Sequence, residues 1–372
     1  MVFGHQLYPF AMNSRFACCL LIALGVNVGC EKFEDPGVNY TYRKPEDIGD
    51  GLSVSGLQQE GLDQVLISAM TDRVIRDEYK RVDGVLILRN GRLVYEEYFH
   101  GYSKDISHNI YSAGKSITSI LMGIAIDRGF IADVDVRVAD LLPEYKDIQN
   151  PDSRKNAITI RHLLNMSSGL DCDDLYLFTE SQMQRSSDWV KFTLDLPMRY
   201  DPGTQGLYCT GGVVVLGRII ENASGMSLED FANRFLFGPL NITRYQWHIM
   251  PDGHPSGGGL LFLSPRDMAK LGQLMLDGGV WNNELIVSRQ WVETSSQIQL
   301  KLSGPFDGYG YLWWKQAFNG VETWFADGNG GQQILIIPEK NAVIVFTGGN
   351  KNTATGLQNF DIVNRYVLPS ML

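Results

Sequence analysis

The stretch 112–127 reads SAGKSITSILMGIAID and opens with a serine and a lysine three positions apart. It contains no proline and is apolar on nearly all sides, which predicts a helix buried in a core. Because positions i and i+3 share a helix face, the Ser112 hydroxyl and the Lys115 amine are expected to lie side by side. A serine beside an amine base is a candidate nucleophile, and the free N–H groups of a helix start favour negative charge at its oxygen.

The ordinary alternative for this pattern is a serine that caps the helix, followed by a lysine in solvent. Two observations favour the catalytic reading: no second S-x-x-K occurs in the sequence, and Lys115 stands where the chain is most apolar. The run Gly114-Lys115-Ser116 also imitates the end of a phosphate-binding loop. That motif requires glycine at position 109, where asparagine stands, so no nucleotide site is predicted.

Composition limits the functions that the chain can have. With 372 residues, 44% hydrophobic and 20% charged, it can bury one large core or two coupled ones. The net charge of −10, without a basic run, argues against a nucleic-acid partner. The six histidines show no metal-ligand spacing and no C-x-x-C occurs, so neither a metal nor a cofactor is predicted.

Residues 1–30 are predicted to be an export signal. A short positive region precedes the apolar run 16–28, which is too short to span a bilayer permanently. Gly29-Cys30 after that run resembles a bacterial lipoprotein cleavage site, although Asn27 departs from the usual aliphatic residue. We therefore expect either a periplasmic protein or a bacterial lipoprotein anchored to the membrane through lipidated Cys30. Residues 31–56 are polar and aperiodic, which favours a flexible tether.

The pattern of strands and helices predicts an α+β fold in a single domain, residues 57–372. Strands 84–89 and 92–98 flank Asn90-Gly91, a type I′ hairpin pair. Four further strands are expected near the other end of the chain, and most of the sequence between is helical. One antiparallel sheet built from both ends, flanked by helices and carrying a mostly helical insert, follows from this order. The expected late elements are strands 309–315, 321–326, 332–337 and 342–347, then a helix over 356–368.

A catalytic serine also needs a proton relay and an oxyanion donor. Tyr208, just before a small-residue helical run, is the candidate relay, and Lys115 nearby is expected to lower its pKa below about 10. Gly328 and Gly330 leave room for a ligand to approach the backbone N–H of Asn329. Trp189 is a candidate for the acyl pocket, with a core position as the alternative.

These features in this order resemble the penicillin-recognising serine hydrolases: class C β-lactamases, D-alanyl-D-alanine carboxypeptidases, and esterase and 6-aminohexanoate-dimer hydrolase relatives. Residues 163–170, LLNMSSGL, are similar to the family's L-L-x-H-T-S-G-L, and 256–260, SGGGL, to its glycine turn. The resemblance covers roughly residues 51–366. It implies a β-lactamase/transpeptidase-like fold, an acyl-enzyme on Ser112, and proton transfer by Lys115 and Tyr208. It also implies an oxyanion hole formed by the N–H groups of Ser112 and Asn329.

The departures from that family pattern bear on the substrate. The Y-x-N motif has become Tyr208-Cys209-Thr210, so a hydroxyl at Thr210 replaces a substrate-binding amide. The K-T-G motif has become Ala326-Asp327-Gly328, which removes the cation expected to bind a carboxylate.

We therefore expect an exported hydrolase of small esters or amides. A D-alanyl-D-alanine-type peptidase, a weak β-lactamase and a catalytically silent cell-wall-binding module stay open as alternatives, and the oligomeric state is undetermined. Cys172 and Cys209 are expected to be separate buried thiols rather than a bridge.

Overall fold

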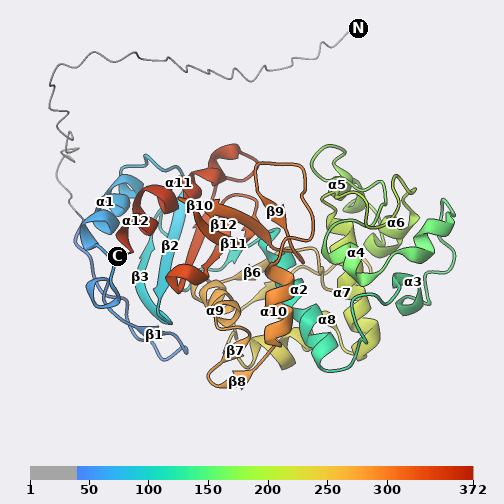
Figure 1. The fold of residues 1–372 in the computed structure, drawn as a ribbon, viewed down its shortest axis with the longest axis horizontal. Helices are drawn as coiled ribbons and strands as arrows, with labels where there is room; N and C mark the ends of the chain where they lie inside the picture. The colour runs from blue at the N-terminus through green and yellow to red at the C-terminus, as the bar shows by residue number, and fades with distance from the viewer. Residues whose placement is uncertain (1–39, 372) are drawn as a thin grey trace, which may run out of the picture. The chain divides into compact units, whose positions relative to one another are not determined.

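An eight-stranded sheet forms the centre of the computed structural model, which describes residues 40–371 (Figure 1). Its strand order is β1-β3-β2-β13-β12-β11-β10-β9, in which β1 runs parallel to β3 and all other neighbours are antiparallel. The remaining strands form two smaller sheets, β4-β6-β5 and β7-β8. Their bounds are β1 Ser53–Val54, β2 Val82–Arg89, β3 Arg92–Tyr98, β4 His108–Asn109, β5 Gln246–Trp247, β6 Leu261–Leu263, β7 Val280–Trp281, β8 Glu284–Leu285, β9 Gly308–Tyr309, β10 Trp314–Phe318, β11 Val321–Gly328, β12 Gln332–Ile337 and β13 Ala342–Gly348.

The two ends of the chain meet where β13 pairs with β2, with Ile344 opposite Ile87. The β2–β3 hairpin turns through Asn90 and Gly91, whose φ angles of 53° and 72° are both left-handed, as a type I′ turn requires. These pairings confirm the predicted sheet assembled from the N-terminal and C-terminal strands.

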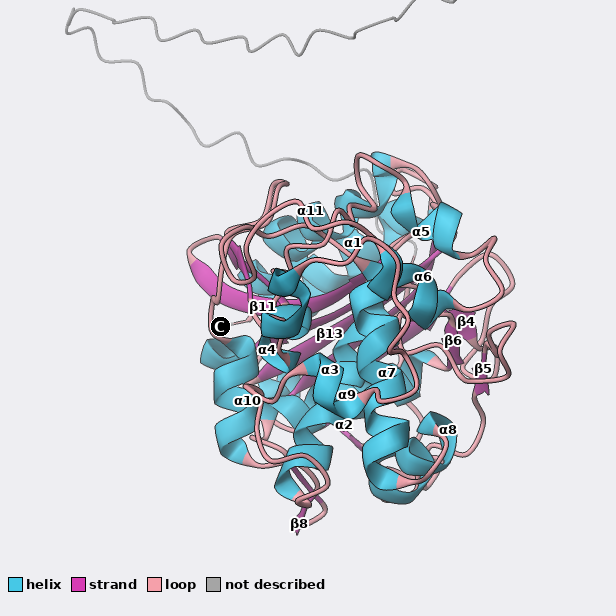
Figure 2. Cartoon of the chain, turned by 90° about the vertical axis from the view of Figure 1, so that its right-hand side faces the viewer, coloured by secondary structure: helices cyan, strands magenta, loops and turns pink. Residues whose placement is uncertain are grey.

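Helices cover both faces of this sheet, as Figures 1 and 2 show. One face packs against α2 and α9, with the helical insert beyond α2, and the other packs against α1, α11 and α12. No helix among residues 40–371 is long and apolar enough to cross a membrane. The helices are α1 Gln64–Ile75, α2 Ala113–Asp127, α3 Val138–Leu141, α4 Ile160–Leu164, α5 Thr179–Met183, α6 Trp189–Asp195, α7 Thr210–Ser224, α8 Leu228–Ala232, α9 Pro265–Leu276, α10 Arg289–Ser296, α11 Gln358–Ile362 and α12 Leu368–Ser370.

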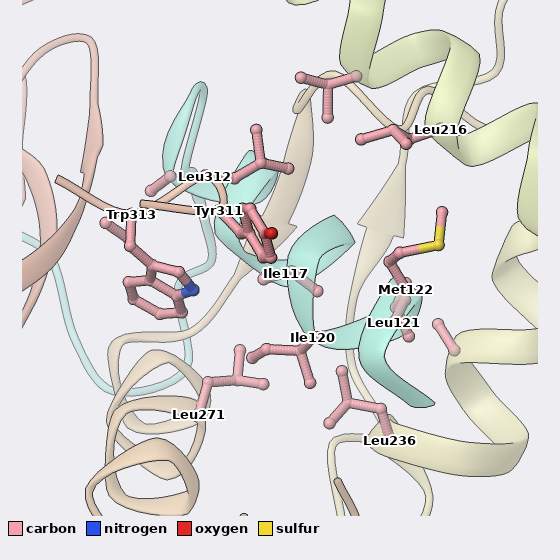
Figure 3. Close-up of a cluster of buried hydrophobic side chains, with 14 of the residues drawn as sticks. Ile117, Ile120, Leu121, Met122, Leu216, Leu236, Leu271, Tyr311, Leu312 and Trp313 are labelled. Carbon is pink, nitrogen blue, oxygen red and sulfur yellow. The ribbon is translucent and has the colours of Figure 1, made fainter. Parts of the chain in front are cut away.

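Helix α2 lies in the middle of the larger core, between the sheet and α7. Its apolar side chains meet others from α7, from α9 and from the turn after β9, as Figure 3 shows around Ile117, Ile120 and Leu121. All three are almost completely buried. Each such side chain stabilises the fold by about 1.5–3 kcal/mol relative to an exposed one, so the helix start that carries Ser112 is held from several directions.

Two stretches differ from the sequence-based expectation. The strand expected over 309–315 is split into β9 and β10, because Leu312 adopts a φ of 64° and turns the chain. Residues 40–56, assigned above to the tether, contact the domain: β1 pairs with β3, and the Tyr42 hydroxyl donates a 2.8 Å hydrogen bond to the carbonyl oxygen of Val94. The expected signal, Cys30 and the first part of the tether lie outside the described residues.

Cys172 and Cys209 form a disulfide bond, so the expectation of two separate thiols is wrong. The two residues are 37 positions apart in sequence, and their Cα atoms lie 5.4 Å apart. Neither spacing nor composition could reveal this, because the fold brings the loop after α4 against the segment before α7. The bridge therefore joins two parts of the helical insert.

We expect the double substitution Cys172→Ala/Cys209→Ala to lower the free energy of unfolding by about 2–4 kcal/mol, because an open loop of this length gains conformational entropy when unfolded. Urea unfolding of the parent and the variant measures the difference. Dithiothreitol should destabilise the parent and leave the variant unchanged. Identical unfolding midpoints without reductant would show that the bridge contributes nothing.

Candidate active site

Ser112 occupies the N-cap of α2, yet its side chain makes no capping hydrogen bond. Instead, the Lys115 ammonium donates a hydrogen bond of 2.8 Å to the Ser112 hydroxyl oxygen. Lys115 is only 1% exposed. The alternative of a capping serine and a solvated lysine therefore does not describe this structure, because the hydroxyl and the buried amine face each other.

The backbone around Ser112 is tightly enclosed. Tyr111, the residue before it, has a φ of 47°, a left-handed conformation that non-glycine residues rarely adopt outside sites that require it. A Cβ added to Gly259 would lie 2.5 Å from the Tyr111 carbonyl oxygen, and one added to Gly328 would lie 2.1 Å from that of Ile110. Two glycine backbones therefore press against this turn and set the position of the serine.

Tyr208 lies beside this pair. Its ring stacks on Trp314 with centroids 5.7 Å apart, and the Lys115 nitrogen lies 5.2 Å from the ring centroid. Burial raises the pKa of Tyr208 above its usual 10, although Lys115 and a hydrogen bond with Ser112 lower it. The expected lowering of this pKa is wrong, because desolvation of the phenolate outweighs the nearby ammonium.

Asp174, to which no sequence pattern pointed, fixes the segment that carries Tyr208. Its N–H donates to the Tyr208 carbonyl oxygen at 2.9 Å, and its carboxylate accepts from the N–H of Thr210 at 2.6 Å. The Cys172–Cys209 bond ties the same two segments covalently. A carboxylate at the first turn of α7 is also favoured by the helix dipole, so Asp174 both caps this helix and positions the tyrosine.

A cleft of about 600 Å³ opens above Ser112. Of the residues predicted from sequence, Ser112, Tyr208 and Asn329 line it, and Lys115 lies beneath the serine. Thr210 and Trp189, both 3% exposed, and the two glycines beside Asn329 do not line it. The remaining lining residues are Tyr111, Asp174, Leu175, Glu180, Ser181, Gln184, Gly258, Leu260, Ser303, Gly304, Pro305, Phe306, Trp314, Asp327, Lys351 and Asn352.

Two backbone N–H groups at the cleft, those of Ser112 and Asn329, are predicted to form an oxyanion hole. Among residues 40–371, neither the N–H of Ser112 nor that of Asn329 donates to a protein acceptor. The Asn329 side chain is occupied by Asn352, to which it donates at 2.6 Å and from whose N–H it accepts at 2.7 Å. This side-chain pairing fixes the turn and leaves the main-chain donor of Asn329 for a ligand.

Carboxylates outnumber cations along the cleft wall. Asp174, Glu180 and Asp327 line it, against Lys351 at the rim. The Asp327 carboxylate accepts a 2.7 Å hydrogen bond from the Gln333 amide, and burial raises its pKa to about 6. Burial also raises the pKa of Asp174. The residue that replaces the threonine of K-T-G therefore carries a poorly solvated negative charge at neutral pH.

Comparisons with known proteins identify relatives in sequence and in fold. A 6-aminohexanoate-dimer hydrolase from Paenarthrobacter ureafaciens is 27% identical over 305 residues, which are 75% of this chain and 76% of that protein. Simvastatin synthase from Aspergillus terreus superposes with a TM-score of 0.64 at 19% identity, covering 82% of this chain and 97% of the other. An octameric penicillin-binding protein homologue from Pyrococcus abyssi does so with a TM-score of 0.63 at 20% identity, covering 82% and 77%.

The fold and the family expected from the motifs are both confirmed. Solved structures that match the chain share the arrangement of helices around a large, mostly antiparallel sheet. A family model described as Beta-lactamase matches residues 71–361, which is most of the chain. Relatives in this family include amidohydrolases, acyltransferases and peptidases. The chain belongs to this beta-lactamase family of serine hydrolases.

Proposed function

We propose that this protein hydrolyses small esters or amides without a negative charge, through an acyl-enzyme on Ser112. The observation that carries the proposal is the 2.8 Å contact between the Lys115 nitrogen and the Ser112 hydroxyl oxygen at the floor of the cleft. Burying a lysine is costly because water no longer solvates its amine. The contact with Ser112 gives this buried amine a partner, which indicates a functional role for the pair.

Lys115 and Tyr208 divide the proton transfers. Because burial raises the pKa of Tyr208, its phenol is protonated at neutral pH and is poised to donate to the leaving group. The neutral form of Lys115 then takes the Ser112 proton as the hydroxyl attacks the carbonyl carbon, and the proton passes through Tyr208 to the leaving oxygen or nitrogen. Water hydrolyses the acyl-enzyme by the reverse transfers. The N–H groups of Ser112 and Asn329 stabilise the oxyanion.

The charges in the cleft favour an uncharged substrate. A β-lactam or a D-alanyl-D-alanine end carries a carboxylate, which Asp327 and Asp174 repel and which Ala326 cannot bind. The 6-aminohexanoate-dimer hydrolase among the relatives supports an amide as the alternative scissile bond. A peptidase, a weak β-lactamase and a silent binding module are the competing functions, and the intact contact of Lys115 with Ser112 argues against the last.

We also propose that the protein is exported. The signal-like N-terminus motivates this, with either periplasmic release or a lipid anchor on Cys30. The bond between Cys172 and Cys209 supports it, because disulfides persist in oxidising compartments and are rare in the cytosol.

Replacing Ser112 by Ala should lower kcat on p-nitrophenyl butyrate on the order of 10⁴-fold or more, because the acyl-enzyme can no longer form. Steady-state kinetics with the purified variant measure this, and its melting temperature should stay near that of the parent. A folded variant that retains near-parental turnover would refute the assignment of the nucleophile and with it the proposed function.

Replacing Tyr208 by Phe should lower kcat on the order of 10²–10⁴-fold, because the proton donor to the leaving group is lost. In the parent, kcat/KM should show no loss from tyrosine ionisation below about pH 9, since the phenol titrates above its usual value. Full pH profiles of both proteins test this. A parent activity that rises with pH through a pKa below 9, and whose rise disappears in the variant, would mean that Tyr208 works as a phenolate.

The parent should hydrolyse neutral p-nitrophenyl butyrate with a higher kcat/KM than anionic nitrocefin. The ratio of the two kcat/KM values should decrease as the pH falls from 8 to 5. Asp327 gains its proton near pH 6 and then no longer repels the anionic substrate. Asp327→Asn should narrow this kcat/KM ratio already at pH 8 and leave a smaller further change at pH 5, the part due to Asp174. A nitrocefin preference at pH 8 would move the protein to the β-lactamase side of the family.

A further inference from the structure

Four consecutive large apolar side chains stand exposed at Leu175, Tyr176, Leu177 and Phe178, a segment that we call the mouth loop. Their exposed fractions are 49%, 68%, 42% and 67%. The other exposed large apolar residues of the described chain occur singly along the sequence. An apolar run that a protein holds in water marks an interaction site more often than chance exposure.

The mouth loop is fixed in this exposed conformation by Asp173, which is 6% exposed. The Asp173 carboxylate accepts from the N–H groups of Leu175 at 3.0 Å and Tyr176 at 3.2 Å. Its carbonyl oxygen accepts from the N–H of Leu177 at 3.0 Å and from the Thr179 hydroxyl at 3.2 Å. These hydrogen bonds to one buried aspartate fix the backbone of the loop, and the fixed backbone holds the apolar side chains in solvent.

Two further features hold the base and the tip of the loop. The Cys172–Cys209 bond anchors its base next to Tyr208, and Phe178 adopts a φ of 53° at the start of α5, a conformation with a cost for an aromatic residue. The strained backbone conformation therefore occurs at Phe178, the last of the four apolar residues, whose side chain is 67% exposed.

The mouth loop is continuous with the catalytic cleft. Leu175 lines the cleft together with Ser112, and Glu180 and Ser181 of the following helix α5 line it too. Leu260, Phe306 and Trp314 supply other apolar parts of the lining. An acyl chain that leaves an apolar phase at Tyr176 and Phe178 thus meets apolar side chains as it enters the cleft toward the serine.

We propose that the mouth loop docks the enzyme onto the surface of an aggregated, uncharged acyl ester, such as an emulsion droplet, and that the acyl chain enters the cleft along Leu175. The nearest acidic groups of the wall, Asp174 and Glu180, make an anionic surface unfavourable and a neutral one suitable. The inference rests on the proposed ester hydrolysis and names its substrate class: water-insoluble esters presented at an interface.

The test compares the parent with Tyr176→Ser/Phe178→Asn, in which asparagine tolerates the left-handed backbone. The matched control is Val65→Ser on α1, which removes an apolar side chain that is 72% exposed and far from the cleft in sequence. On a tributyrin emulsion the double variant should lose on the order of tenfold or more in rate, because two apolar anchors are gone. On monomeric p-nitrophenyl acetate, kcat/KM should stay within about twofold of the parent, and the control should match the parent on both substrates.

A binding measurement separates docking from chemistry. In a Ser112→Ala background, which cannot consume the ester, the protein should bind triolein droplets stabilised by phosphatidylcholine, and the double substitution should weaken binding by a similar factor. Parent-like droplet binding and emulsion rates in the double variant would overturn the proposal. So would an equal loss on both substrates, or a dimer that the double variant dissociates without losing emulsion rate. If the parent hydrolysed no ester but droplet binding still depended on the mouth loop, only the proposed function would be refuted.

Discussion

The buried contact between the Lys115 nitrogen and the Ser112 oxygen is the interaction on which the rest of the site depends. Burying an amine in an apolar core costs free energy unless the amine has a hydrogen-bond partner. The Ser112 hydroxyl is that partner, so the fold must hold the start of α2 rigidly. The core around α2 provides that rigidity, and the glycines at 259 and 328 allow two backbones to approach the serine from either side.

The rigid serine turn would be useless without an equally fixed tyrosine. Tyr208 lies on a segment without regular structure, and three links hold it: stacking on Trp314, hydrogen bonds with Asp174, and the covalent bond of the next residue to Cys172. Burial then keeps its phenol protonated, which assigns it the donor role. The disulfide thus contributes to the geometry of the site as well as to the stability of the insert.

The sheet and the order of the site residues followed from the sequence, because hairpin turns, apolar periodicity and the S-x-x-K spacing are local signals. Asp174, the disulfide and the exposure of the mouth loop did not, because each depends on how the segment after α4 packs against the segment before α7. The prediction for the pKa of Tyr208 failed for another reason. Nearby Lys115 suggested a lowered pKa, but the burial that raises it is not visible in a sequence. Trp189 and Thr210, predicted to contact the substrate, do not line the cleft, because the sequence does not show which side an aromatic ring or a hydroxyl faces.

The proposed chemistry depends on an acyl group carried by Ser112. The most direct measurement mixes the Tyr208→Phe variant with p-nitrophenyl acetate. The acyl-enzyme still forms, because p-nitrophenolate leaves without a proton, but its hydrolysis lacks the proton transfers through Tyr208. The reaction is quenched in acid, and the modified peptide is mapped by mass spectrometry. We expect one added acetyl group per chain, on Ser112. An acetyl group on any other residue, or rapid release of p-nitrophenol with no covalent adduct, would contradict it.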